Sequence, residues 1–173
     1  MNETALRLLL ERVRSGELAI DNAVNRRRDL AFRVVGEAVL DSHRELRRGH
    51  PEVIYCAGKT VAQVRTIVAA MLEGEGDILA TRATPEMAEA VAELSPDARY
   101  NPLGRTLVIR RRARPPTATF IAIVTAGTSD QPVAEEAAET ALLFGNRIER
   151  INDVGVAGLH RLLARLDVIR AAR

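Results

Sequence analysis

The feature that most limits what this chain can fold into is the alternation of short apolar runs with stretches of helical spacing from residue 52 onward. The predicted strands are residues 53–55, 78–81, 106–109, 120–125 and 147–151, and the predicted helices are residues 61–72, 85–94, 132–144 and 156–166. Strands that alternate with helices are typical of a parallel sheet with crossover helices. The sequence therefore predicts an α/β fold.

The end of the alternation is its most regular part, with a strand, a loop and a helix repeated between residues 120 and 166. Residues 167–173 then stand where the pattern predicts one more buried strand, so we expect a domain that is truncated or completed elsewhere. The basic segment 110–116 fits a hairpin or a looped connection equally well. The α/β domain is expected to span residues 51–173 and to lack its C-terminal part.

The first 50 residues follow another pattern. Apolar residues recur at helical spacing in residues 4–14, Ser15-Gly16 interrupts them, and a second helix is predicted for residues 17–28. The apolar stripes of this helical hairpin need another surface to cover them. Residues 30–49 are expected to form an ordered connector.

Composition narrows the classes of function. There is a single cysteine, Cys56, so an intrachain disulfide and a cysteine-rich zinc site are excluded, and in its apolar context the thiol is expected to be inert. No apolar run approaches the ~18 residues of a membrane span, so we expect a cytoplasmic protein without a membrane partner. Few aromatics and a single lysine, Lys59, leave arginine as the main binder of phosphate or carboxylate groups.

Two predicted loops are candidates for ligand binding. Gly127, Thr128, Ser129 and Asp130 follow a buried strand and precede a helix, where free backbone amides favour a phosphate. The alternative is plain helix capping, because Thr128 and Gln131 have the spacing of a capping box. The loop at residues 152–158 follows the adjacent strand, so its Asp153 and Gly155 should face the first loop. There Asp153 would bind ribose hydroxyls or orient a reacting group, unless the loop is only a turn before a helix.

Other polar clusters are less specific. Lys59 lies between Gly58 and Thr60 at a strand-to-helix junction, but the P-loop pattern fails because Val53 stands where its first glycine is required. Lys59 can still bind an anion. The cluster Asp41, Ser42, His43, Arg44, Arg47 and Arg48 either reaches an active site or forms a solvated charged face. The arginine run at residues 110–114 is typical of a solvated loop, and nucleic-acid binding is not expected.

Several of these segments resemble the LarB family of nickel-pincer cofactor biosynthesis proteins. Residues 125–137 and 153–163 carry the resemblance, and residues 41–44, 48–54 and 58–60 add to it, so that it spans essentially the whole chain. The loop at residues 127–130 is also similar to the phosphate-holding loop of AIR carboxylases. The resemblance implies an AIR carboxylase-like, flavodoxin-like fold and a ribonucleotide phosphate at this loop.

The resemblance also implies a reaction. LarB proteins carboxylate the pyridinium ring of nicotinic acid adenine dinucleotide and cleave its phosphoanhydride, releasing AMP, as a first step toward the cofactor of lactate racemase. A cysteine adds to the ring and makes it a nucleophile toward CO2. The implied partners are this dinucleotide or a related nucleotide, CO2 or bicarbonate, and further copies of the chain. No tightly bound cofactor is implied, and Mg2+ is compatible with the reaction.

The sequence departs from the family in the catalytic part. The family cysteine lies in a later strand-and-loop region, and Cys56 does not replace it by position, so the catalytic residues stay unassigned. Purine chemistry of the AIR carboxylase or N5-carboxyaminoimidazole ribonucleotide mutase kind is an alternative, but residues 153–156 replace its serine-alanine-histidine-arginine motif. Two further hypotheses are a nucleotide-binding remnant without catalysis and an arginine-rich interaction module. We expect substrate binding through Gly127, Thr128, Ser129, Asp130, Asp153, Gly155, Asp41, Arg44 and Lys59.

Overall fold

The structure is a computed structural model that describes residues 3–28, 32–41 and 44–172. Its helices are α1 (Glu3–Arg14), α2 (Ile20–Arg28), α3 (Arg44–Arg48), α4 (Val61–Leu72), α5 (Pro85–Ala92), α6 (Gln131–Leu143), α7 (Leu159–Leu163) and α8 (Leu166–Ala171), with 3-10 turns η1 (Thr128–Asp130) and η2 (Val156–Gly158). Its strands are β1 (Arg33–Val35), β2 (Ala38–Leu40), β3 (Val53–Tyr55), β4 (Ile78–Thr81), β5 (Arg99–Asn101), β6 (Thr106–Ile109), β7 (Phe120–Val124) and β8 (Arg147–Ile151). The predicted α/β class is confirmed.

The strands form separate sheets. β3, β4, β6 and β5 make a four-stranded sheet in that order, and β7 pairs with β8 in a second sheet. The pairs β3–β4 and β7–β8 are parallel and are joined through α4 and α6, as crossover helices require. β6 is antiparallel to both β4 and β5, because residues 102–105 are too few for a crossover between β5 and β6. The sheet is therefore mixed.

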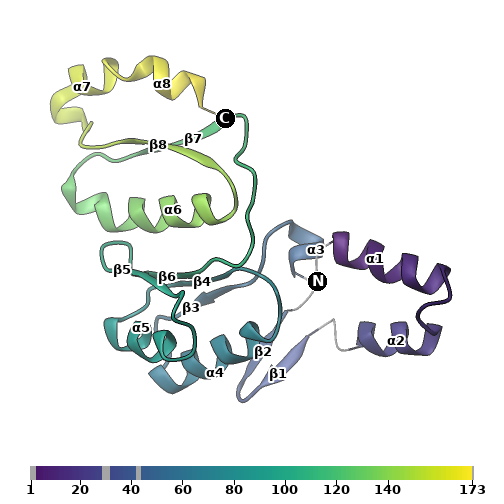
Figure 1. Cartoon of the computed structure of the whole chain (residues 1–173). Coiled ribbons are helices and arrows are strands. Elements are labelled where there is room, and N and C mark those ends of the chain that lie inside the picture. Colours follow the sequence, from purple (N-terminus) through teal and green to yellow (C-terminus); the bar gives the residue numbers. More distant parts are fainter. Residues whose placement is uncertain (1–2, 29–31, 42–43, 173) are drawn as a thin grey trace.

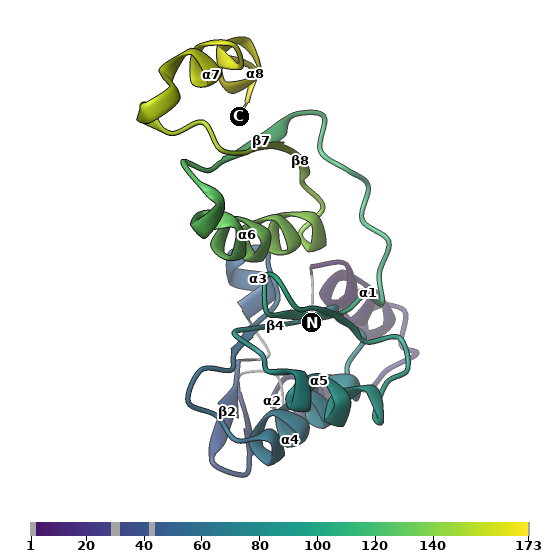
Figure 2. The same cartoon turned by 90° about the vertical axis from the view of Figure 1, so that its left-hand side faces the viewer.

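The sheets and helices are stacked in layers (Figures 1 and 2). α4 and α5 cover one face of the four-stranded sheet, α6 lies between that sheet and β7–β8, and α7 and α8 lie beyond β7–β8. α6 contacts strands of both sheets, namely β4, β6, β7 and β8. α6 therefore packs against both sheets and fixes how the strand ends of one sheet lie relative to those of the other.

Burial follows the alternation of side chains along the strands. Leu107 of β6 belongs to the larger apolar cluster on the α4 and α5 face, whereas Leu79 and Val108 pack with Leu143 of α6 on the other face. Ile78, Leu79 and Leu107 are almost completely buried. β4 and β6 are buried on both faces, which explains why they read as continuous apolar runs in the sequence.

Most of the predicted elements coincide with observed ones. Four predicted strands coincide with β3, β4, β6 and β8, and segment 110–116 is a looped connection between two sheets. β5 was not predicted, because its short segment Arg99–Asn101 has only one strongly strand-forming residue. Where the pattern calls for one more buried strand, the described residues form the helix α8, Leu166–Ala171, so that completion of the domain by a further strand stays a prediction.

The N-terminal helical hairpin is confirmed by α1 and α2, which contact each other and project away from the layers (Figure 1). The connector contains the antiparallel hairpin β1–β2 and the short helix α3. The division of the chain at residue 50 stays a prediction.

Candidate functional site

The two predicted ligand loops lie side by side at the carboxyl ends of β7 and β8. The Val154 amide donates to the Thr125 carbonyl at 3.0 Å, and the Gly155 amide donates to the Ala126 carbonyl at 3.0 Å. The Asp153 amide donates to the hydroxyl of Thr125 at 3.2 Å. The loops are therefore joined directly, as expected from the parallel pairing of their strands.

Gly155 is required for this contact. A Cβ atom at this position would lie 2.7 Å from the Ala126 carbonyl oxygen, which is backbone. The φ of Gly155 is −63°, so the backbone conformation itself would suit any residue. Glycine is thus needed here for close approach and not for a left-handed turn.

Asp130 organises the first loop. Its carboxylate accepts hydrogen bonds from the amides of Ala126 at 2.9 Å and Gly127 at 3.0 Å. The amide of Gly127, one of those that the sequence assigned to a phosphate, is thus occupied by the chain itself, as is that of the preceding residue Ala126. The amides of Thr128 and Ser129 begin the 3-10 turn η1, where backbone donors have no partner within the helix.

The capping alternative takes another form than expected. The side chain of Gln131 donates to the hydroxyl of Thr125 at 3.4 Å, and its backbone amide donates to the Thr128 carbonyl, but no described hydrogen bond joins the Thr128 and Gln131 pair in the manner of a capping box. The capping box between Thr128 and Gln131 is therefore wrong. Thr128 and Ser129 are exposed, so their hydroxyl groups face solvent at the N-terminal end of α6. These groups, together with the free first-turn amides, are the donors available to an anion.

Asp153 has a left-handed backbone with φ 58°, which is unusual for a residue other than glycine. Its carboxylate forms an ion pair with Arg161 of α7. Such strain persists where the surrounding structure imposes it and is frequent at functional sites. Arg161 was not predicted as a site residue, although it lies in one of the two segments that carry the resemblance.

Lys59 lies apart from the two loops. It follows β3 and, with Gly36, Glu37 and Gln63, lines a cavity of about 420 Å³ between the β1–β2 hairpin and α4. Among the described residues the Lys59 ammonium has no acidic partner. Thr60 is the N-cap of α4 and forms a capping box with Gln63. Anion binding by Lys59 stays a prediction.

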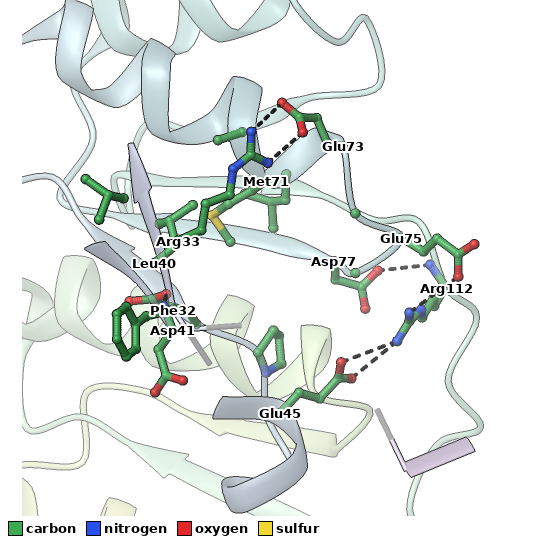
Figure 3. A pocket seen from close by; sticks show the side chains of 17 residues that line it. Phe32, Arg33, Leu40, Asp41, Glu45, Met71, Glu73, Glu75, Asp77 and Arg112 are labelled. Atoms are coloured by element: carbon green, nitrogen blue, oxygen red, sulfur yellow. Dashed lines mark hydrogen bonds and ion pairs between the residues drawn. The ribbon is translucent and has the colours of Figure 1, made fainter. Parts of the chain in front are cut away.

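Asp41 and Arg44 precede β3 in the chain. They lie at the edge of the four-stranded sheet where β3 and β4 begin, opposite the edge where Lys59 follows β3. Asp41 lines a second cavity of about 800 Å³ with residues that precede β3 and β4, including Glu52 and Asp77 (Figure 3). The cavity is lined by six carboxylates but only two arginines, Arg33 and Arg112. Because carboxylates outnumber arginines in its lining, this cavity disfavours a phosphate, and substrate binding by Asp41 and Arg44 stays a prediction. Ser42 and His43 lie outside the described residues.

Two carboxylates of the larger cavity, Glu73 and Glu45, are paired with arginines of this chain. Arg33 donates to both oxygens of Glu73, and Arg112 and Arg114 both contact Glu45. Figure 3 shows the pairs of Arg33 with Glu73 and Arg112 with Glu45 lining the cavity. Arg112 and Arg114 of the arginine run thus connect the segment after β6 to helix α3 of the connector.

Cys56 is buried behind β3, as predicted, and burial raises the pKa of its thiol to about 11, although Lys59 nearby favours the thiolate. Because the thiolate is the reactive form, iodoacetamide should alkylate folded protein very slowly at pH 8 and about tenfold faster per pH unit up to pH 11. The measurement is mass-spectrometric labelling over a pH series. Protein unfolded in urea is the control and should react quickly at pH 8, near the ordinary thiol pKa of about 8.5. Equal rates in both states would contradict an inert thiol.

Within residues 3–28, 32–41 and 44–172, no three His, Cys, Asp or Glu side chains are grouped so as to hold a metal ion. No helix in these ranges combines the length and the apolarity that a membrane span requires.

Comparisons with known proteins add to this geometry. Residues 32–112 match the family model described as the LarB/PurE-like N-terminal domain. The chain is also similar to the protein named "Uncharacterized protein MJ0165" of Methanocaldococcus jannaschii, with 32% identity over an alignment of 173 residues. That alignment covers 93% of this chain and 66% of the relative. The family match contains the four-stranded sheet, whereas the two loops lie beyond it.

Proposed function

This chain belongs to the LarB/PurE-like family, and on that premise we propose that it is the nucleotide-binding part of a carboxylase-related enzyme of nucleotide metabolism. The proposed substrate is nicotinic acid adenine dinucleotide, and the proposed reaction is carboxylation of its pyridinium ring with release of AMP in nickel-pincer cofactor biosynthesis. The chain spans 66% of the length of its Methanocaldococcus relative, so the reaction of a whole enzyme is part of the proposal.

The observation that carries the proposal is the junction of two strand-end loops at the N-terminal end of α6. Open α/β sheets bind ligands outside the carboxyl ends of parallel strands. Here Gly155 brings the second loop against Ala126 of the first, and Thr128 and Ser129 present hydroxyl groups and first-turn amides. The positive end of the α6 dipole favours a phosphate at the same place. These features support a nucleotide phosphate at residues 127–130.

Asp130 has a defined part in this proposal. Its carboxylate holds the amides of Ala126 and Gly127 and so keeps the loop in shape without a ligand. A bound phosphate would therefore contact Thr128 and Ser129 first. Asp153, paired with Arg161, would orient the ribose. Cys56 takes no covalent role, because it is buried and its thiol has a raised pKa.

The experiment is calorimetric titration of the purified chain with nicotinic acid adenine dinucleotide. We expect saturable binding that inorganic phosphate competes away. Thr128→Val and Ser129→Ala together should weaken binding about a hundredfold or more, since each hydrogen bond to a charged group contributes a net ~1.5–3 kcal/mol and every ~1.4 kcal/mol is tenfold in affinity. Thr119→Val, in the exposed segment before β7, is the matched control. A folded chain that binds no dinucleotide would refute the proposal.

A turnover assay separates an enzyme from a binding remnant. The chain is incubated with the dinucleotide, bicarbonate and Mg2+, and mass spectrometry then detects AMP and a carboxylated product. Binding without turnover would favour the binding remnant over a complete enzyme. We also propose that the chain acts in the cytoplasm and that it self-associates. Sedimentation of the purified protein would test the self-association.

A further inference from the structure

α6 packs against strands of both sheets, so the residues at its two ends show which ends of these strands lie on the same side of the molecule. Near its N-terminal half lie the β5–β6 turn and Arg82, which directly follows β4; a Cβ atom on Gly104 of that turn would lie 3.0 Å from the Glu136 amide. Near its C-terminal end lie His50, whose ring stacks on Phe144, and Arg110, which donates to the Leu142 carbonyl. The carboxyl end of β4 therefore lies on the same side of the molecule as the loops after β7 and β8.

Two residues on this side hold a strained backbone. Arg82 has φ 56° and Arg105 has φ 50°, and the only other described residue of this kind besides glycine is Asp153. The Ala83 amide donates to the Arg105 carbonyl at 2.8 Å, which locks the two arginines together. All three left-handed side-chain-bearing residues thus lie at the edge that holds the proposed nucleotide site, as strain does at many functional sites.

The guanidinium groups of this pair are not fully neutralised. Arg82 Nε lies 2.7 Å from Glu136 Oε2, and the described contacts of Arg82 use no other guanidinium nitrogen. In its described hydrogen bonds the Arg105 guanidinium donates to the carbonyl oxygens of Ala83 and Arg82, at 3.4 and 3.3 Å. Among the described residues Arg105 has no carboxylate partner. One positive charge therefore remains available to an anion, in the planar geometry that suits a carboxylate.

We infer that Arg82 and Arg105 bind a second anionic group of the substrate, a carboxylate carried on the base of the nucleotide; this inference rests on the proposed function. Glu136, the partner of Arg82, lies five residues after the first residue of α6, or about 7.5 Å along the axis from the loop. The two phosphates of a dinucleotide are directly linked and would both lie near the loop. A charge at this separation instead corresponds to a group on the far side of the ribose.

The test compares two dinucleotides that differ only in this group, one with nicotinic acid and one with nicotinamide. We expect the unchanged chain to prefer the acid. Arg105→Gln and Arg82→Gln should weaken binding of the acid about tenfold and leave binding of the amide within about twofold. Arg147→Gln is the matched control, because Arg147 is also exposed and donates to a backbone carbonyl, but it begins β8 and so lies at the opposite edge.

A second variant separates binding from folding. Arg105→Gly relieves the left-handed strain and should raise the melting temperature by about 2–4 °C, while still abolishing the preference for the acid. Equal weakening of both dinucleotides, or no change in either, would overturn the inference and leave the nucleotide site standing. If the unchanged chain binds neither dinucleotide, the proposed function fails and the inference fails with it.

Discussion

Gly155→Ala is expected to weaken binding of nicotinic acid adenine dinucleotide at least tenfold and to lower the free energy of unfolding by about 1–3 kcal/mol, the usual cost of inserting a methyl group into a packed place. The new Cβ would lie 2.7 Å from the Ala126 carbonyl oxygen, so one of the two loops must move. Since φ is −63°, backbone strain contributes nothing and the effect is steric. Calorimetric titration and urea unfolding measure the two quantities.

Gly127→Ala is the control for this prediction. Gly127 has an extended backbone with φ −150°, and a Cβ atom there would have no neighbour within 4 Å. Its stability should therefore stay within about 0.5 kcal/mol of the unchanged chain. If Gly155→Ala bound the dinucleotide as well as the unchanged chain, the joined loops would not be the nucleotide site.

Asp77→Ala is expected to lower the free energy of unfolding by about 3–5 kcal/mol, the range seen when one partner of a buried charged network is removed. Asp77 is 2% exposed. One oxygen accepts from the amides of Arg111 at 2.7 Å and Arg112 at 2.9 Å, and the other lies 3.5 Å from Arg114 Nε. The substitution leaves the two part-buried amides and the buried Nε of Arg114 without this acceptor. Urea unfolding followed by circular dichroism measures the loss.

Two further variants identify the cause of this loss. Asp77→Asn keeps one carbonyl oxygen for the two amides and should lose clearly less stability than Asp77→Ala. Glu75→Ala removes a nearby carboxylate whose side chain is 90% exposed and 3.9 Å from Arg112, so it should change stability by less than about 0.5 kcal/mol. A loss for Glu75→Ala as large as for Asp77→Ala would mean that general charge balance, and not the buried contacts, stabilises this segment.

Strands that are buried on both faces were predicted best. β4 and β6 consist of residues with little exposure, so their apolar runs are continuous and bounded by polar residues. β5 escaped prediction because an edge strand is stabilised by its pairing with β6 and not by its own composition. The last segment, Leu166–Ala171, has no sheet neighbour among the described strands and forms a helix through local hydrogen bonds.

The candidate site was predicted in part. Parallel strands end at one edge, so the neighbourhood of residues 127–130 and 152–155 followed from order alone. The same rule does not bring Asp41 and Arg44 to these loops, because both residues precede β3 and so lie at the edge where the strands begin. Arg82 follows a predicted strand and was accessible to the same reasoning. Arg105 was not, because β6 runs antiparallel to β4 and reverses which of its ends meets the site.

The amino-acid sequence by itself determined the α/β class, most strand positions and the pairing of two loops, because these depend on side-chain periodicity and on the direction of neighbouring strands. Only the tertiary structure decided which amides are already occupied, which arginines are neutralised and which edge each polar cluster joins. Asp130 takes up the amides of the residues three and four positions before it. Asp77 and Glu45 take up the arginine run from segments 34 and 69 residues away in the chain. Such contacts depend on distances of a few ångströms, which no spacing along the sequence encodes.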